Sequence, residues 1–369
     1  METTTYKLKD VLKIGNGKDH SSLPDGEYPV LGSGGIMRYA NRYLYDGESV
    51  LLPRKGTLNN IQYIKGKFWT VDTCYYTIIN QDITHPYYLY RLLRTFDLSG
   101  LDSGASIPSM TSKTYYGIKV QLPPLPTQQK IASILSAYDN LIQNYKKQIE
   151  ALQTAASELY KEWFVRFRFP GYQTTNFENG IPEGWKVEKL FDVAKIIYGY
   201  PFNSDEFCDD STLNPVVRIR DILDNHTDTY TSESCDEKYW INPNEMLIGM
   251  DGIFHMTLWT GERALQNQRT VRVTSKVRNL SNYYLYFSLY PQIKALEQMI
   301  VGTTVAHLGD KHLKKITILV PEEKILKMSY EKLEPMMNRL YSLQQQITNL
   351  TQQRDLLLPR LMSGKLEVK

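Results

Sequence analysis

The chain of 369 residues has only three cysteines, Cys74, Cys208 and Cys235, and they are widely spaced. An odd number of cysteines without a Cys-x-x-Cys pair argues against a disulfide framework and against a standard zinc site. No run of 18 apolar residues occurs, and the first residues, Met-Glu-Thr-Thr-Thr-Tyr-Lys, lack the apolar segment of a secretion signal. These absences favour a soluble protein of the cell interior with no bound metal and no membrane partner.

A strong excess of charge is also absent, because 43 basic and 40 acidic residues leave a formal net charge of +3. The distribution is nevertheless uneven. Residues 205–245 hold 11 acidic and 3 basic residues, whereas residues 246–315 hold 9 basic and 4 acidic residues. A polyanionic ligand would therefore meet this half of the chain through residues 246–315.

Catalytic motifs are missing as well. A methyltransferase acting on amino groups needs an Asn/Asp-Pro-Pro-aromatic loop, and neither Asn214-Pro215-Val216 nor Asn242-Pro243-Asn244 supplies it. Ser363-Gly364-Lys365-Leu366 lacks the upstream glycine and the hydroxyl of a phosphate-binding loop. The faint nuclease pattern of Glu322-x-Lys324 lies where a strand should join a helix, which favours a structural role. The sequence predicts a non-catalytic protein without a cofactor of its own.

Two heptad patterns are the most regular feature that is present. Each combines two series of apolar residues seven positions apart, which is the signature of a coiled-coil seam. The first pattern consists of Ile131, Tyr138, Tyr145, Leu152 and Leu159 with Leu135, Ile142, Ile149, Ala156 and Trp163. The second, 198 residues later, consists of Met336, Leu343, Leu350 and Leu357 with Leu333, Leu340, Ile347 and Leu361, interrupted at Ser329 and Arg354. Each pattern predicts a helix of roughly 35 residues.

Each predicted helix needs an apolar partner for its stripe. We favour antiparallel pairing of the two helices within one chain, which would hold a globule at each end, related by an approximate two-fold axis. Pairing with a second copy of the chain is the alternative. Arg354 stands where the first helix has Ala156, so it either fixes the register of the pair or reaches a carboxylate outside it.

The segments before the two helices repeat each other too. Residues 7–17 and 189–199 share seven identities in eleven positions at an offset of 182. From residue 104 onward the offset is 198, and it relates Met110 and Lys113 to Leu308 and Lys311. The second copy therefore carries 16 additional residues, and we place them in the acidic tract 205–237 as a solvated insertion.

The first copy has the pattern of a small sheet covered by a helix. Short β-rich runs at 50–52, 61–64, 75–79 and 118–122 are separated by glycine turns, and a helical pattern follows Pro86 as far as Phe96. The run of prolines at 123–126 should end this domain, with Thr127 as the N-cap of the long helix. Pro170-Gly171 should end that helix near Phe169.

The predicted fold is α+β, with two α/β globules in internal repeat separated by two long helices that form an antiparallel coiled coil. The predicted segments are globule 1–125, helix 126–169, linker 170–184, globule 185–321 and helix 322–369.

Several short motifs accompany this plan. They are Tyr28-Pro29-Val30, Gly32-Ser33-Gly34-Gly35-Ile36, Tyr45-Asp46-Gly47-Glu48, Leu52-Pro53-Arg54-Lys55-Gly56, Phe68-Trp69-Thr70-Val71-Asp72-Thr73, Leu122-Pro123-Pro124-Leu125-Pro126-Thr127-Gln128-Gln129-Lys130-Ile131, Asn179-Gly180-Ile181-Pro182-Glu183-Gly184-Trp185 and Leu357-Leu358-Pro359-Arg360-Leu361-Met362-Ser363-Gly364-Lys365-Leu366. With them, the whole chain resembles the specificity (S) subunit of type I restriction–modification systems.

The resemblance implies a cytoplasmic protein of a bacterium or archaeon. Each globule would be a target recognition domain for one half of a bipartite site in double-stranded DNA. The helices would set the spacer between the halves and dock two methyltransferase (M) subunits, which restriction (R) subunits can join. It implies S-adenosylmethionine, ATP and magnesium on these partner subunits and no cofactor on this chain.

Side chains in glycine-rich turns are the predicted DNA contacts, because arginine pairs with guanine, asparagine and glutamine pair with adenine, and lysine binds phosphate. In the first domain they are Ser33, Arg38, Arg54, Lys55, Thr57, Asn59, Asn60 and Lys113. In the second domain they are Gln266, Asn267, Gln268, Arg269, Thr303, Thr304, His307 and Lys311. Arg218 and Arg220 are further predicted DNA contacts of the second domain. The second domain has Gly249-Met250-Asp251-Gly252 in place of the basic loop Pro53-Arg54-Lys55-Gly56.

Three alternatives stay open. Lys113 and Lys311 occupy equivalent repeat positions, so they share either a phosphate contact or the capping of a turn. Arg166 and Arg168 alternate with phenylalanines, which suits either a nucleic-acid stripe or, as we favour, a helix end packed on its neighbour. The whole chain could also be a coiled-coil adaptor that joins two proteins without touching DNA.

Overall fold

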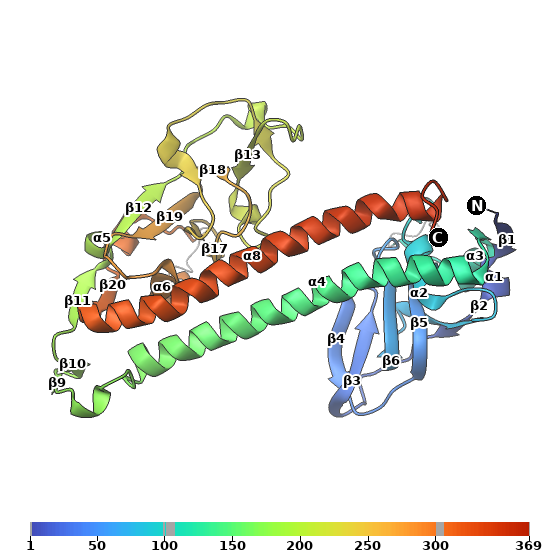
Figure 1. Cartoon of the computed structure of the whole chain (residues 1–369), viewed down its shortest axis with the longest axis horizontal. Coiled ribbons are helices and arrows are strands. Elements are labelled where there is room, and N and C mark those ends of the chain that lie inside the picture. The colour runs from blue at the N-terminus through green and yellow to red at the C-terminus, as the bar shows by residue number, and fades with distance from the viewer. Residues whose placement is uncertain (1, 99, 101–107, 300–305, 369) are drawn as a thin grey trace. The chain divides into compact units, whose positions relative to one another are not determined.

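The computed structural model describes residues 2–98, 100, 108–299 and 306–368. It divides the chain into two compact units (Figure 1). Unit 1 comprises Met1–Gln143 and Leu350–Lys369, and unit 2 comprises Asn144–Asn349. Within the described ranges, no helix is both long and apolar enough to cross a membrane.

Unit 1 is built on a six-stranded sheet with the strand order β2-β7-β5-β6-β3-β4. The strands are β2 (Leu12–Asn16), β3 (Asp25–Gly32), β4 (Gly35–Ala40), β5 (Tyr45–Pro53), β6 (Gln62–Thr70) and β7 (Cys74–Ile79). All pairs are antiparallel except β3 with β6. Helix α2 (Pro86–Leu93) packs on β5 and β6 and buries Leu89 and Leu93 against Val50 and Leu52. The predicted sheet with a covering helix is confirmed.

One predicted strand lies elsewhere. β8 (Lys119–Leu122) pairs with β1 (Thr4–Lys7) in a separate two-stranded ribbon, so the prediction that residues 118–122 join the sheet is wrong. Between β1 and β2 the short helix α1 (Leu8–Val11) turns the chain, and Leu8 N–H donates to Ile118 O at 2.9 Å. β1 escaped prediction because three of its four residues are exposed and the strand shows no apolar alternation.

Unit 2 repeats this plan, as the sequence repeat predicts. Its corresponding elements are β11 (Lys186–Lys189), α5 (Leu190–Val193), β12 (Ala194–Tyr198), α6 (Asn282–Met299), α7 (Asp310–Leu313) and β20 (Thr317–Val320). The ribbons also share their register, since Thr4 opposes Leu122 in unit 1 and Lys186 opposes Val320 in unit 2. The main sheet has four strands in the order β12-β19-β16-β17, where the others are β16 (Met246–Gly249), β17 (Met256–Leu258) and β19 (Thr270–Ser275).

The acidic tract is not the solvated insertion that we predicted. It contributes β13 (Asn214–Val217) and β14 (Tyr230–Thr231) to a second sheet in unit 2, together with β15 (Trp240–Ile241) and β18 (Ala264–Gln266). Apolar residues between the acids pack into a core with later segments of unit 2: Val217 and Ile222 are fully buried together with Leu247 and Trp259. Most of the carboxylates stay exposed, but Asp221 is 9% exposed and pairs with Arg218 and Arg220.

The two heptad patterns form α4 (Leu125–Tyr160) and α8 (Glu323–Met362). Thr127 is not the N-cap of α4, because the helix begins two residues earlier and Gln128 N–H already donates to Pro124 O at 3.1 Å. Proline is tolerated in a first turn, where its missing N–H would have no partner.

The end of the first helix also differs from the prediction. A π-helical turn, Lys161–Val165, follows α4, and Arg166 N–H donates to Lys161 O at 2.8 Å. Phe167 then takes a φ of 55°, so the helix ends before Phe169. The positive φ of a phenylalanine cannot be foreseen from the sequence pattern.

α4 and α8 contact each other within each unit, running in opposite directions. In unit 1, Ile131 and Leu135 of α4 share a core with Leu361 of α8. In unit 2, Ala156 of α4 shares a core with Leu333 of α8, and Arg339 donates to Gln148 at 3.3 Å. Every residue of the two predicted seams is buried or half-buried. The stripes are therefore covered within the chain.

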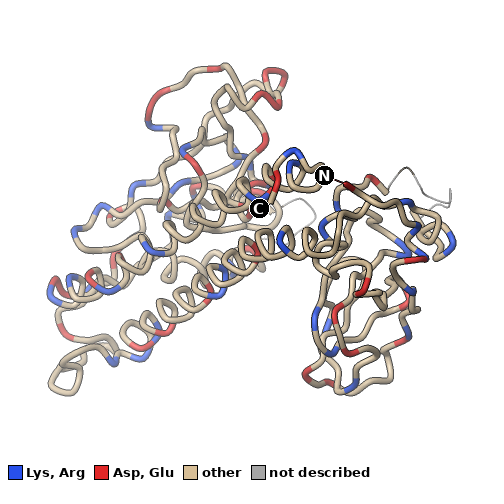
Figure 2. Tube along the Cα trace, turned by 45° about the vertical axis from the view of Figure 1, so that its right-hand side comes forward, with Lys and Arg blue, Asp and Glu red and all other residues tan. Residues whose placement is uncertain are grey.

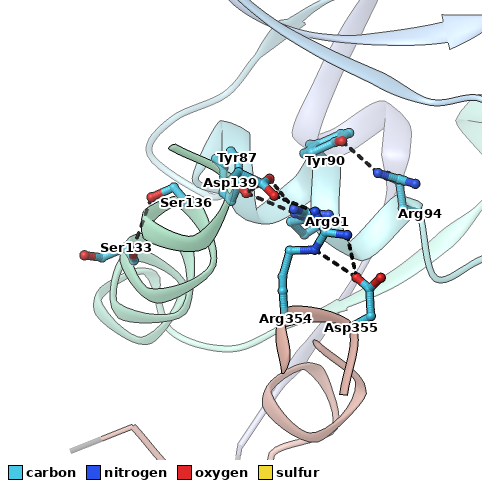
Figure 3. Close-up of polar contacts among 9 residues, drawn as sticks. All are labelled: Tyr87, Tyr90, Arg91, Arg94, Ser133, Ser136, Asp139, Arg354 and Asp355. Atoms are coloured by element: carbon cyan, nitrogen blue, oxygen red, sulfur yellow. Dashed lines mark hydrogen bonds and ion pairs between the residues drawn. The ribbon is translucent and has the colours of Figure 1, made fainter. Parts of the chain in front are cut away.

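Arg354 pairs inside unit 1 (Figure 3). Its Nη1 donates to Oδ1 of Asp139 on α4 at 2.7 Å, and its Nε donates to Asp355 at 2.8 Å. Tyr87 and Arg91 of α2 donate to the other oxygen of Asp139. Of the two roles left open for Arg354, the structure contradicts the outside carboxylate and supports the contact across the helix pair.

The phenylalanines after α4 pack on Trp185, as we favoured. The ring centroids of Phe164, Phe167 and Phe169 lie 5.9, 5.7 and 4.9 Å from that of Trp185, which is 5% exposed. The intervening arginines pair with Glu162. The linker that follows folds into a hairpin of β9 (Phe177–Glu178) and β10 (Ile181–Pro182).

Candidate nucleic-acid interface

Three backbone segments meet at one place in unit 1, which we call the first corner: residues 53–57, 72–74 and 108–111. Arg54 N–H donates to Thr73 O at 2.8 Å, and Arg54 O accepts from Met110 N–H at 3.0 Å. Gly56 N–H donates to Pro108 O at 3.0 Å. The corner therefore joins the loop after β5, the start of β7 and the segment before helix α3 (Ser112–Gly117).

Unit 2 contains the equivalent second corner: residues 249–253, 268–270 and 306–309. Met250 N–H donates to Arg269 O at 3.0 Å, and Met250 O accepts from Leu308 N–H at 2.7 Å. Gly252 N–H donates to Ala306 O at 2.9 Å. The same three hydrogen bonds thus recur at matching positions of the repeat. Gly56 and Gly252 both take positive φ, 90° and 68°, which favours glycine.

Several residues of unit 1 that we predicted as DNA contacts make polar contacts within unit 1. Asn60 Nδ2 donates to Ser33 O at 2.6 Å, which ties the β3–β4 turn to the loop before β6. Asn59 Nδ2 donates to Asp97 at 3.2 Å, and its Oδ1 accepts from Leu98 N–H at 2.8 Å. Arg38 lies on β4 and pairs with Asp25 at 2.5 Å. The sequence indicated polar residues in turns, but it did not indicate which groups of the protein they contact.

Other predicted contacts of unit 1 lie at the surface. Lys55, Thr57 and Lys113 are exposed, and Arg54 is half-buried with its guanidinium 5.8 Å from the centroid of Tyr75. These side chains can offer charge and hydrogen-bond donors to phosphates and base edges.

Lys113 and Lys311 are both exposed and both lie at the second position of a short helix, α3 and α7. The side chain of Thr111 caps α3. At α7, Gly309 N–H donates to His312 Nδ1 at 3.1 Å. Burial and the nearby lysines lower the pKa of His312, which favours the neutral imidazole that can accept this bond. The hydrogen bonds at the two helix starts are thus made by Thr111 and His312, and the phosphate contact remains a prediction for both lysines.

Gln266 and Asn267, which we predicted as DNA contacts in a glycine-rich turn, do not lie at the surface. Gln266 is 0% exposed, and its Nε2 donates to Ile197 O at 3.0 Å and Thr270 O at 3.1 Å. Asn267 is 6% exposed. The run of amides resembles a surface loop in the sequence, but the first of them satisfies carbonyls of neighbouring strand ends, and this pairing requires burial.

The remaining candidates of unit 2 differ in accessibility. Arg218 is half-buried, donates to Thr229 and lies with its guanidinium 5.6 Å from the Phe207 centroid. Arg220, Gln268, Arg269 and His307 are exposed. Thr303 and Thr304 lie outside the described residues.

Asp251 is the site residue that sequence reasoning passed over. Its Oδ2 accepts from Arg269 Nη1 at 3.0 Å, and its Oδ1 lies 2.7 Å from His307 Nδ1. The repeat alignment places Asp251 opposite Lys55, and this equivalence could have identified it. We did not include Asp251 among the DNA contacts because an acidic residue differs from the basic loop of the first domain.

Across the described ranges, no group of three or more His, Cys, Asp or Glu side chains is placed to hold a metal ion. Lysines and arginines occur in both units (Figure 2). What the two corners offer chemically is a set of exposed donors on a hydrogen-bonded backbone frame, and this arrangement suits binding of an anionic, polar ligand.

Comparison with known proteins agrees with this chemistry. A sequence model of the "Type I restriction modification DNA specificity domain" matches residues 1–154 and 182–352. The type I restriction enzyme MjaIX specificity subunit of Methanocaldococcus jannaschii is 25% identical over 407 residues, which cover 98% of this chain and 93% of the relative. The EcoBI specificity subunit of Escherichia coli is 30% identical over 180 residues, which cover 49% of this chain and 38% of the relative.

The fold is shared with a solved structure. The S subunit of a type I restriction–modification system from M. genitalium superposes with a TM-score of 0.69 at 13% identity, over 98% of this chain and 96% of that chain.

Proposed function

The chain belongs to the type I restriction–modification DNA specificity family, and we propose on this basis that it is a non-catalytic subunit that recognises a bipartite DNA target. Each of the two matched segments would recognise one half of the target. The names of the relatives, specificity subunits of type I restriction enzymes, support the same role.

The observation that carries the proposal is the pair of corners. They share three backbone hydrogen bonds but present different side chains, Lys55 in unit 1 and Asp251 with Arg269 in unit 2. A common frame with different donors and acceptors is what recognition of two unlike half-sites requires, because base edges are distinguished by their hydrogen-bonding pattern.

Partner subunits would supply the catalytic activities for which this sequence has no motifs. We propose that two M subunits bind S-adenosylmethionine and methylate the DNA, and that R subunits bring ATP- and magnesium-dependent cleavage. Helices α4 and α8 would dock the M subunits and set the spacer between half-sites. This assignment is supported by the missing catalytic motifs in the sequence and by the apolar seams, which extend through both units.

Equilibrium binding to duplex DNA tests the proposal. The full chain with its M subunits should bind its mapped site, and the affinity should fall steeply as salt rises from 50 to 200 mM, because phosphate contacts release counterions. M subunits alone should bind far more weakly. If the chain adds no affinity for DNA, it is an adaptor between proteins and the proposal fails.

A further inference from the structure

The second corner has an acidic residue where the first has a basic one. Asp251 and Lys55 occupy the same position in the frame of backbone hydrogen bonds, and Arg269 takes the position of Thr73. Unit 1 thus presents its cation on the loop after β5, whereas unit 2 presents its cation at the start of β19 and sets a carboxylate beside it.

A carboxylate near DNA repels phosphates and weakens binding to every sequence. In the second corner, however, both oxygens of Asp251 are engaged, one with Arg269 at 3.0 Å and the other with His307 at 2.7 Å. The Asp251 side chain is 24% exposed, while those of Arg269 and His307 are 60% and 54% exposed. A sheltered carboxylate therefore holds two exposed donors.

The guanidinium of Arg269, fixed by Asp251, is suited to contact guanine. Arginine has five N–H donors in a rigid fork, so the nitrogen that pairs with Asp251 leaves further donors for a ligand. Two such donors match O6 and N7 of guanine in the major groove, which is the commonest specific contact between a protein and DNA. Fixing the fork in advance lowers the entropy that is lost when this contact forms.

We propose that Asp251 is a positioning residue that orients Arg269 for one guanine of the half-site recognised by unit 2. The inference rests on the proposed function and goes further, because it assigns one base and the residue pair that selects it. His307 completes the arrangement by occupying the second carboxylate oxygen, which fixes the rotation of Asp251.

The Asp251→Asn variant separates positioning from mere proximity, since only positioning predicts a change in the ratio of specific to random affinity. If Asp251 were only a nearby charge, its removal would strengthen binding to specific and random DNA alike. If it positions Arg269, the ratio of specific to random affinity falls about tenfold while affinity for random DNA does not fall. The matched control is Asp209→Asn, the same charge change at an exposed residue of the acidic tract, which should leave the ratio unchanged.

The experiment measures binding of the full chain with its M subunits to the mapped duplex and to random duplex. Each guanine of the mapped site is replaced in turn by 7-deazaguanine, which lacks the N7 acceptor. The wild-type complex should lose about tenfold in affinity at one guanine or more, and Asp251→Asn and Arg269→Lys should each abolish the loss at the same single guanine. The lysine variant keeps the charge but not the fork, and it serves also if Asp251→Asn fails to fold.

Three results overturn the inference: an unchanged ratio in Asp251→Asn, the same ratio change in Asp209→Asn, or no guanine whose 7-deaza penalty depends on Arg269. Failure of the wild-type complex to prefer the mapped site over random DNA is a different result. It overturns the proposed function itself.

Discussion

Asp139 holds side chains from two other helices of unit 1. It accepts from Tyr87 and Arg91 of α2 and from Arg354 of α8. Arg91 is only 2% exposed, and Asp139 supplies the counter-charge of its buried guanidinium. Burial by itself raises the pKa of Asp139, but the hydrogen bonds and the two arginines outweigh it and hold the pKa below its ordinary value. The carboxylate therefore stabilises the folded unit in its ionised form.

We predict that Asp139→Asn lowers the free energy of unfolding by about 2–3 kcal/mol at pH 7, because it leaves a buried guanidinium without its counter-charge. A carboxylate whose folded pKa is depressed stabilises above its unfolded pKa, and this stabilisation is lost as the pH falls through the folded pKa. The difference between wild type and variant should therefore shrink below about pH 4. Denaturant titrations at pH 7 and pH 3.5 measure it.

The control for this prediction is Asp355→Asn, which removes an exposed partner of Arg354 and should change stability by less than about 0.5 kcal/mol. A deficit of Asp139→Asn that is equal at both pH values would contradict the account. The sequence identified Arg354 as the break in its seam, but its partner lies 215 residues away. Pairing over that separation depends on how the helices pack, which the heptad pattern alone does not specify.

At the scale of elements, the sequence pattern predicted the long helices and three of the six strands of the first sheet, β5, β6 and β7, because one buried face imposes a regular spacing. It did not predict where elements end. The start of α4 at Leu125 and the turn at Phe167 depend on local backbone geometry. The burial of Gln266 and the folding of the acidic tract depend on tertiary contacts. The two corners could not be predicted from the sequence because each joins three segments that are distant along the chain.

The aromatic cluster that ends the first helix gives a prediction for this scale. Trp185→Ala should destabilise unit 2 by about 3–5 kcal/mol, since it removes a buried indole that three phenylalanines contact. Phe177→Ala, at a residue that is 48% exposed, should cost much less. Denaturant unfolding followed by circular dichroism measures both, and equal losses would show that the cluster does not support unit 2.

At the scale of the whole molecule, the offset of 198 residues persists through both helices. Packing enforces such equality, because an insertion that is not a whole heptad moves apolar residues out of the seam. The helices would then set the spacer of the DNA target through their length.

Adding seven residues to both helices, at Gln143 and at Leu350 where the units divide, tests this role. Each helix lengthens by about 10 Å at 1.5 Å per residue, which is close to three base pairs at about 3.4 Å per step. Methylome mapping should show a spacer longer by about that amount. A four-residue insertion in α4 alone should change the spacer by one or two base pairs or abolish binding, because it breaks the match between the seams. An active seven-residue variant with its original spacer would show that the helices do not measure DNA.

The central claim is that each unit recognises one half of a bipartite target. Exchanging residues 185–321 for the matching segment of a relative with a different target, followed by methylome mapping in cells, tests it most directly. The account predicts that one half of the methylated sequence changes to that of the relative while the other half and the spacer stay the same. Simultaneous change of both halves in an active protein would contradict it.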